Sequence, residues 1–437
     1  MTGAGVRSPR GGRVASLVAL VAAVVLAASP VSQAAQGSEG SADPDVSAAT
    51  WLLLDPSDGQ ALAAHDPSKE RPIASTTKLM TAYLALKNLS MKQKLEVPAY
   101  SPGPAESVAG LIKGERLTVH DLLTAMMLPS ANDAAVTVAD GVAGSQKAFV
   151  AEMNQAAARL GLDHTSYANP IGLDAKDNYS SAADLADLSL ELLGDRRFRK
   201  IVAEPEATLT SGSQERVVEN TNTLLLSDPS VDGVKTGHTL DAGYVLVASA
   251  KRDGIPLIAA VLGAPSEADR DASAESLLDY GYSLYDTKRV VKKGEELAAA
   301  AVRYEDDDLP LLAEHTISLA VRKDQEVRVE VEGPMHVEGP IADGERLGEV
   351  TVTIDGELAD RTPLIAGRTV EEPTLIDRIG GPLVAALIVL AVVVILAAVA
   401  FLVRRRRHGD EQGERDPEER MRTRQERIRR RDEGEGE

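Results

Sequence analysis

The hydrophobic pattern of this chain contains two long apolar runs and one change in the period at which apolar residues recur. The first run is residues 14–28 (VASLVALVAAVVLAA), and the second is residues 379–403, which contain no charged side chain. Between them, residues 45–285 mix helical periods with short apolar strands, whereas residues 288–373 alternate polar and apolar positions with a period of two. The pattern predicts two folded domains of different architecture, framed by two segments with membrane-like hydrophobicity.

Two hairpins and a helix-rich middle are predicted for residues 47–285. An Asp-Gly pair marks each hairpin turn, at residues 58–59 and 253–254. Helical periods dominate the interval up to Leu193, and a last helix is predicted for Ala272–Tyr285. Because strands at both ends flank the helices, we expect one α/β or α+β unit whose sheet joins distant segments. Its four strands are predicted at Trp51–Leu54, Ala61–Ala64, Val245–Ala250 and Pro256–Leu262.

Residues 288–373 are predicted to form a small antiparallel β domain with one solvated face. Three stretches show the two-residue period, at Thr316–Val321, Glu326–Glu332 and Glu349–Ile354. Turn residues separate them, including the Asp-Gly pairs at 343–344 and 355–356. Nothing in this stretch signals a ligand.

The N-terminus is typical of a secretory signal peptide. Arginines at positions 7, 10 and 13 precede the first apolar run, and small residues follow at Ser32, Ala34 and Ala35. We therefore predict a signal peptide at residues 1–34 and a linker at 35–46. An uncleaved N-terminal anchor is the alternative.

The second apolar run is predicted to be a transmembrane helix. Its 25 residues suffice to cross a hydrocarbon core of about 30 Å. Four arginines, Arg404–Arg407, follow at once and place that end in the cytoplasm. We expect a single-pass protein of the cell membrane, with residues 35–378 outside and a charged cytoplasmic tail at 404–437.

Charge and composition exclude several function classes. The net charge is −20, and so acidic a protein repels phosphate polymers, which argues against nucleic acid as a partner. The chain has no cysteine, so disulfides, cysteine nucleophiles and thiolate metal sites are excluded. Its seven histidines show no metal-binding spacing, and we predict neither a metal nor a cofactor. The sequence carries no signal for an oligomeric state.

The first chemical motif is Ser75-Thr-Thr-Lys78, which leads into an apolar helical pattern that continues to Leu89. If Ser75 begins that helix, Ser75 and Lys78 share a face. The positive end of the helix dipole then disfavours the ammonium form of Lys78 and keeps it available as a base. A serine hydroxyl needs such a neighbour to act as a nucleophile. Taken alone, the motif equally describes a helix N-cap with a surface lysine.

Two later motifs have the same ambiguity when each is taken alone. Ser130-Ala-Asn132 separates two helical stretches and is predicted to lie on a connecting turn, where serine and asparagine are also common caps. Lys235-Thr236-Gly237 enters a strand-like run. Together, however, Ser-x-x-Lys, Ser-x-Asn and Lys-Thr-Gly are the signature of serine β-lactamases and penicillin-binding proteins. Each occurs here once, in that order.

Over roughly residues 47–370 the sequence resembles the low-molecular-mass D,D-carboxypeptidases of the penicillin-binding family (peptidase S11 type). The resemblance implies a penicillin-recognising, β-lactamase-like domain followed by a β-sandwich. It also implies peptidoglycan stem peptides as substrates and β-lactam antibiotics as covalent inhibitors. Beyond the three motifs it is carried by Ala48–Asp55, Ser130–Ala135, Leu160–Leu162, Gly172–Asp174, Gly263–Ala264 and Pro363–Ala366.

Three catalytic roles follow from the resemblance. Ser75 would attack the carbonyl of the D-Ala–D-Ala bond and become an acyl-ester. Lys78 would take the serine proton. Ser130 would relay a proton to the leaving amine.

The resemblance also implies a set of substrate-binding residues. Lys235 would tune Ser130 and hold the terminal carboxylate together with Thr236, and Asn132 would position the acyl amide. Gly237 and His238 continue that strand, and the backbone N–H groups of Ser75 and His238 would form the oxyanion hole. The His238 side chain itself is expected to lie on the surface.

The chain departs from the family pattern in two places. It ends in a full membrane span with an arginine-rich tail, where Gram-negative members end in an amphipathic helix. A basic residue expected near the carboxylate site is replaced by Thr221 or Thr223. Arg270 is a candidate for the missing carboxylate partner, and a solvated surface arginine is the alternative.

Other functions share parts of this pattern. A serine β-lactamase has the same fold and motifs but needs a glutamate-activated water for deacylation, and no acidic residue stands in a convincing context for that role. A D,D-endopeptidase differs only in the shape of its cleft. A non-catalytic wall-binding module is disfavoured because Ser75, Lys78 and Ser130 are all present.

Overall fold

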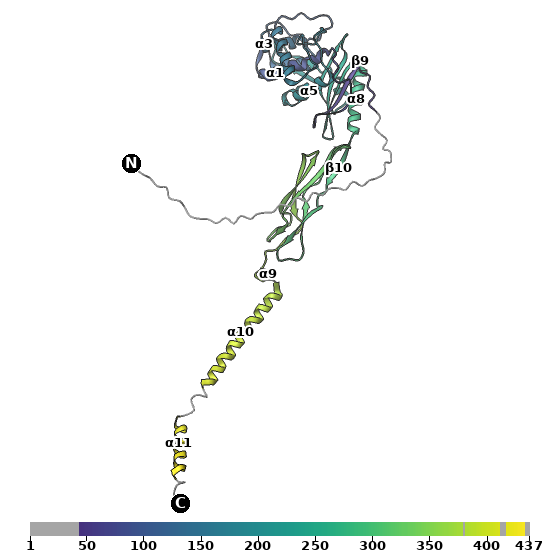
Figure 1. Cartoon of the computed structure of the whole chain (residues 1–437). Coiled ribbons are helices and arrows are strands. Elements are labelled where there is room, and N and C mark those ends of the chain that lie inside the picture. Colours follow the sequence, from purple (N-terminus) through teal and green to yellow (C-terminus); the bar gives the residue numbers. More distant parts are fainter. Residues whose placement is uncertain (1–42, 379–380, 411–416, 433–437) are drawn as a thin grey trace, which may run out of the picture. The chain divides into compact units, whose positions relative to one another are not determined.

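The computed structural model describes residues 43–378, 381–410 and 417–432 (Figure 1). The predicted signal peptide, most of the predicted linker and the first two residues of the predicted span lie outside these residues. The described residues form two compact units. The first contains residues 43–288 together with 319–325, and the second contains 289–318 and the residues from 326 onward.

One five-stranded antiparallel sheet forms the centre of the first unit. The strand order is β2-β1-β9-β8-β7, so the N-terminal hairpin pairs with a strand some 200 residues later in the chain. Leu52 of β1 lies opposite Ala260 of β9. The prediction of a sheet assembled from distant segments is confirmed. The strands are β1 (Thr50–Asp55), β2 (Gln60–His65), β7 (Val231–Thr239), β8 (Gly243–Arg252) and β9 (Ile255–Ala264).

Helices cover both faces of this sheet, with α8 on the side opposite α1, α3 and α5 (Figure 1). In β8, Val245 and Val247 pack with the larger group of helices, whereas Leu246 and Ala248 pack with α8. A strand buried on both faces has no polar face, which explains the unbroken apolar runs. The helices are α1 (Lys78–Asn88), α2 (Val119–Met127), α3 (Asn132–Ala143), α4 (Gln146–Leu160), α5 (Ala182–Leu193), α6 (Arg196–Val202), α7 (Thr223–Ser227) and α8 (Glu267–Ser283).

Serine and threonine caps set several helix starts, and one predicted start is wrong for that reason. The helix predicted from Ala272 begins at Glu267, because the Ser266 side chain accepts a hydrogen bond from the Asp269 N–H. At its other end, the predicted last residue, Tyr285, belongs to strand β10 (Tyr285–Val291). The apolar period is interrupted in the first turn of α8, so the sequence pattern missed it.

The first unit also contains two short antiparallel strand pairs outside the main sheet. β3 (Lys94–Glu96) pairs with β4 (Arg116–Thr118), and β5 (Glu206–Leu209) pairs with β6 (Arg216–Glu219). Residues 97–115 form the long loop between β3 and β4.

The second unit contains a six-stranded sheet of order β14-β16-β17-β12-β11-β15. Its pairs are antiparallel except for the short β11–β15 pair, which is parallel. In β16, Val350 and Val352 are fully buried while Glu349 and Thr351 are partly exposed, as the two-residue period predicts. The strands are β11 (Glu296–Val302), β12 (Leu309–Ala313), β14 (Val327–Glu332), β15 (His336–Val337), β16 (Arg346–Ile354) and β17 (Glu357–Ala366); β13 (Ile317–Arg322) pairs with β10.

A short helix, α9 (Leu375–Arg378), precedes α10 (Gly381–Asp410), and α11 (Pro417–Asp432) follows. Within the described residues, Gly381–Arg406 is the one helix long and apolar enough to cross a membrane, with a mean hydropathy of 3.4. None of the residues of its apolar window is buried. This helix could anchor the chain in a membrane.

Candidate active site

Ser75 lies in a short 3₁₀ turn, Ala74–Thr77, and α1 begins directly after it at Lys78. The sequence pattern predicts Ser75 at the start of the helix, whereas the α-helix begins three residues later. Ser75 and Lys78 are three residues apart across the junction of the turn and the helix, a spacing that places two side chains on one face. The distance between Lys78 Nζ and Ser75 Oγ is 2.9 Å. The turn therefore brings a nucleophile and a base into hydrogen-bond contact.

Lys78 is completely buried, which excludes the alternative of a surface lysine. Its Nζ donates a second hydrogen bond, of 2.6 Å, to the carbonyl oxygen of Ile171. Burial lowers the pKa of Lys78 well below its usual value, and the charge of Lys235 lowers it further. Carboxylates at Glu106 and Asp133 oppose this shift without cancelling it. A neutral amine held in this way can accept the serine proton.

Residues 169–173 form the wall that holds Lys78. The Asn169 side-chain oxygen accepts hydrogen bonds from the N–H groups of Ile171, Gly172 and Leu173, at 3.2, 2.6 and 3.1 Å. Gly172 has φ +91°, and a Cβ atom there would lie 2.0 Å from the carbonyl oxygen of Ala74. Only glycine lets this segment pass so close to the nucleophile turn.

Ser130 connects α2 to α3 in a left-handed conformation, with φ +65°. Its hydroxyl is buried and has no hydrogen-bond partner in the protein. Asn132 was expected on the same turn but is the first residue of α3. Buried polar groups are nearly always hydrogen-bonded, so an unpartnered hydroxyl here is typical of a site completed by substrate.

Strand β7 passes close to the turn that contains Ser75. Lys235 is 1% exposed, and its Nζ has no hydrogen-bond partner. Burial lowers the pKa of Lys235 to about 7, with a contribution from the charge of Arg270. A Cβ on Gly237 would lie 3.0 Å from the backbone nitrogen of Ser75, so this glycine lets the strand reach the nucleophile. The exposed His238 ring stacks on Tyr244.

Thr221 contacts Thr236 of β7, and the charge of Arg270 acts on Lys235 of the same strand. Arg270 is only 3% exposed, so the alternative of a solvated surface arginine is wrong. Its guanidinium donates to Thr223 Oγ1 at 2.9 Å and forms an ion pair with Asp271 at 2.7 Å. Thr221 Oγ1 lies 2.7 Å from Thr236 Oγ1. A hydroxyl therefore contacts Thr236 where the family pattern suggested a basic side chain.

Sequence reasoning missed two carboxylates near this cluster. Glu106 comes from the long β3–β4 loop and accepts a 2.8 Å hydrogen bond from Asn132 Nδ2. Asp133 sits next to Asn132 in the chain and, like Glu106, acts electrostatically on Lys78. No local motif marks Glu106, since the loop that carries it has neither helical nor strand periodicity.

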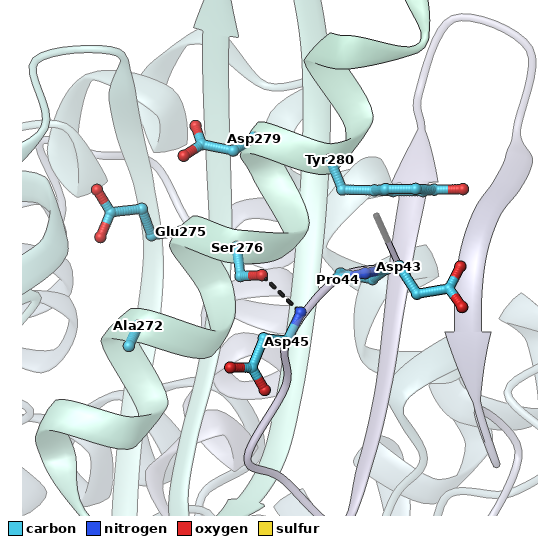
Figure 2. Close-up of a pocket in the computed structure, with 8 residues that line it drawn as sticks. All are labelled: Asp43, Pro44, Asp45, Ala272, Glu275, Ser276, Asp279 and Tyr280. Atoms are coloured by element: carbon cyan, nitrogen blue, oxygen red, sulfur yellow. Dashed lines mark hydrogen bonds between the residues drawn. The ribbon is translucent and has the colours of Figure 1, made fainter. Parts of the chain in front are cut away.

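A hollow between α8 and the segment that precedes β1 contains none of the motif residues, and Figure 2 shows its lining. Asp43, Asp45, Glu275 and Asp279 contribute acidic side chains, and the N–H of Asp45 donates to Ser276 Oγ at 2.9 Å. A surface of this charge repels a carboxylate-bearing substrate. Over the described residues, no group of three or more potential metal ligands is found.

A serine in contact with a buried lysine, an unpartnered buried serine and an unpartnered buried lysine on an edge strand define a penicillin-recognising serine hydrolase. The model of the D-alanyl-D-alanine carboxypeptidase family matches residues 37–266. The model of the C-terminal domain of penicillin-binding protein 5 matches residues 285–372. The chain belongs to the D-alanyl-D-alanine carboxypeptidase family.

Relatives cover most of the chain. D-alanyl-D-alanine carboxypeptidase DacF of Bacillus subtilis is 32% identical over 329 residues, which is 73% of this chain and 85% of the relative. DacA of Escherichia coli is 33% identical over 354 residues, 77% of this chain and 87% of the relative.

Solved structures show the same fold. Penicillin-binding protein 5 of Haemophilus influenzae aligns over 76% of this chain and all of its own, with a TM-score of 0.54 and 30% identity. The DD-transpeptidase of Streptomyces K15 aligns over 55% of this chain and 99% of its own, with a TM-score of 0.53 and 32% identity.

Proposed function

We propose that this chain is a membrane-anchored serine D-alanyl-D-alanine carboxypeptidase that trims the terminal D-Ala from peptidoglycan stem pentapeptides. The observation that carries the proposal is the 2.9 Å contact between Ser75 Oγ and the buried amine of Lys78. A lysine of lowered pKa in contact with a serine can activate that serine for acyl transfer.

Acylation begins when Ser75 Oγ attacks the carbonyl carbon of the penultimate D-Ala while Lys78 Nζ takes the hydroxyl proton. Backbone N–H groups of Ser75 and His238 stabilise the oxyanion. The tetrahedral intermediate collapses, the C–N bond breaks, and the Ser130 hydroxyl relays a proton to the departing D-Ala amine. Water then attacks the ester, Lys78 receives the water proton, and Ser75 leaves protonated.

Lys235, Thr236 and Arg270 recognise the terminal carboxylate of the substrate. The unpartnered Nζ of Lys235 supplies a donor, and an anionic ligand favours its charged form. Thr236 contributes a hydroxyl that Thr221 contacts from behind. Arg270 adds positive charge from the first turn of α8. Asn132 holds the acyl amide of the substrate.

The same proposal covers domain organisation and topology. The apolar helix within Gly381–Arg406, followed by Arg404–Arg407, supports a single span with the enzyme domain outside the cell. We propose a signal peptide (1–34), a linker (35–46), the carboxypeptidase domain (47–285), the β domain (288–373), the span (379–403) and a cytoplasmic tail (404–437).

The direct test is to locate the acylated residue and detect the product. Full-length protein in detergent is labelled with a fluorescent penicillin, digested and mapped, and D-alanine release from a pentapeptide is followed by mass spectrometry. We expect the adduct on Ser75 and one D-alanine released per peptide. A label on Ser130, or no label on folded protein, contradicts the mechanism.

The acyl-enzyme formed with penicillin is expected to persist for minutes or longer. An opened β-lactam keeps its leaving group tethered and obstructs the approach of water, whereas D-Ala departs from the cleft. Such a lifetime corresponds to a barrier above about 20 kcal/mol, against about 16 kcal/mol for peptide turnover at about 10 per second. Loss of bound penicillin is timed beside D-alanine release. Rapid penicillin hydrolysis without D-alanine release would instead favour a β-lactamase.

A further inference from the structure

Glu106 is a carboxylate in direct contact with the proposed site, although it belongs to none of the three motifs. One oxygen, Oε1, accepts a 2.9 Å hydrogen bond from the N–H of Gly103. The other, Oε2, accepts from Asn132 Nδ2 at 2.8 Å and from the hydroxyl of Tyr100. Three donors thus converge on a single carboxylate.

The loop that carries Glu106 is fastened to the first turn of α3. The backbone N–H of Asn132 donates to the carbonyl of Ser107 at 2.8 Å. The Asp133 carboxylate accepts from the N–H groups of Ala109 and Leu111 at 3.0 and 2.9 Å. These bonds join two consecutive residues of α3 to the segment that follows Glu106. The position of Glu106 relative to Asn132 is therefore fixed by the backbone.

The far end of the same loop is anchored as well. Glu115 and Arg216 form an ion pair of 2.8 Å in which both side chains are buried. The carboxylate of Glu115 also accepts the N–H of Ser213 at 2.9 Å. A loop held at both ends can position a side chain with the precision that a binding site needs.

The chemistry of the contact decides which way the Asn132 amide points. An ionised carboxylate is acceptor-only, so the NH₂ group of Asn132 must face Glu106 and its oxygen must face elsewhere. Without such a partner the two ends of an amide are nearly interchangeable. We propose that Glu106 is a positioning residue that fixes the Asn132 amide in the orientation that holds the acyl amide of the substrate. This inference rests on the proposed function, because that function assigns the acyl amide to Asn132.

Glu106 is poorly suited to the other role that a glutamate here suggests, the general base of deacylation. Burial alone would raise the pKa of Glu106, but the hydrogen bonds from Tyr100, Gly103 and Asn132, with the charge of Lys78, lower it. A carboxylate stabilised in its ionised form by three donors is a weak base towards water. These interactions suit Glu106 to orienting the Asn132 amide rather than to accepting a proton from water.

The test compares Glu106→Gln with two β-lactams. A glutamine has one acceptor oxygen and one NH₂ group, so it cannot satisfy Gly103 on one side and Asn132 with Tyr100 on the other. Benzylpenicillin carries an acyl amide, whereas 6-aminopenicillanic acid has a free amino group in its place. The rate constant for acylation of the full-length protein is measured with each, beside thermal stability. Glu96→Gln, the same change on an exposed residue at the base of the loop, is the matched control.

We expect Glu106→Gln to slow acylation by benzylpenicillin about tenfold or more, the usual effect of losing a charged hydrogen bond, and acylation by 6-aminopenicillanic acid less than about threefold. The control should change neither rate. Equal losses with both compounds would overturn the proposal and leave a merely structural role. Unchanged acylation with slower hydrolysis of the acyl-enzyme would overturn it in favour of a deacylating base.

The pH profile provides a second readout. The negative charge of Glu106 favours the ammonium form of Lys78, so its removal lowers the pKa of Lys78 further. The acid limb of the acylation profile should therefore move to lower pH in Glu106→Gln, and an unmoved limb would contradict the placement of Glu106 beside the base. Absence of acylation in the unsubstituted protein would refute the proposed function itself, which keeps the two failures distinguishable.

Discussion

Replacing Lys78 by methionine is expected to reduce acylation of Ser75 by at least about 10²- to 10⁴-fold, the typical contribution of a general base. Methionine is similar in length but cannot accept the serine proton. Because Lys78 is 0% exposed, an alanine would leave a cavity, and methionine avoids most of that effect. The carbonyl of Ile171 loses a partner, at a cost of about 1–3 kcal/mol in unfolding free energy.

The measurement is the rate of acylation by benzylpenicillin, beside the midpoint of thermal unfolding. Lys87→Met is the matched control, since Lys87 lies in the last turn of the same helix with its side chain 56% exposed. It should acylate at the unsubstituted rate. If Lys78→Met stays folded and loses less than about tenfold in rate, another group accepts the serine proton.

Gly172→Ala is expected to lower both stability and acylation, because the new methyl group collides with the nucleophile turn. Its Cβ would lie 2.0 Å from the oxygen of Ala74 and 2.9 Å from the nitrogen of Ser75. Relief of the clash must move either Ser75 or Ile171, and either movement separates Lys78 from a partner. Forced overpacking costs about 1–3 kcal/mol. The left-handed backbone adds about 1–2 kcal/mol for a residue with a Cβ.

Gly254→Ala separates these two contributions. Gly254 has φ +88°, close to that of Gly172, but a Cβ there meets nothing within 4 Å. It should show the backbone penalty alone, with acylation unchanged. Unfolding in urea gives the two free energies, and benzylpenicillin gives the two rates. Equal losses of stability and normal acylation in both variants would show that the nucleophile turn tolerates the clash.

The sequence predicted those helices, strands and turns that are marked by a short local pattern, such as a turn dipeptide or a two-residue alternation. The Asp-Gly turns located two of the three hairpins of the main sheet, at residues 58–59 and 253–254. The third hairpin joins β7 to β8, and β7, which contains Lys235-Thr236-Gly237, was not assigned as a strand. The two-residue period located β13, β14 and β16, but β11, β12 and β17 were not assigned, because Ala-rich and Pro-containing strands blur that period. Helix α8 was misplaced at its start because a cap, rather than an apolar residue, begins it.

The sequence by itself determined the class of enzyme, because three short motifs in a fixed order identify it without any knowledge of where they lie in the fold. Only the tertiary structure decided how that chemistry is tuned. The low pKa of Lys78 requires complete burial and a neighbouring Lys235, which is 157 residues away in the chain. The need for glycine at position 172 arises from its approach to Ala74, and the contact of Glu106 with Asn132 arises from a loop folded onto α3. Burial, charge and close approach depend on distances in space, and a linear pattern of residues does not contain them.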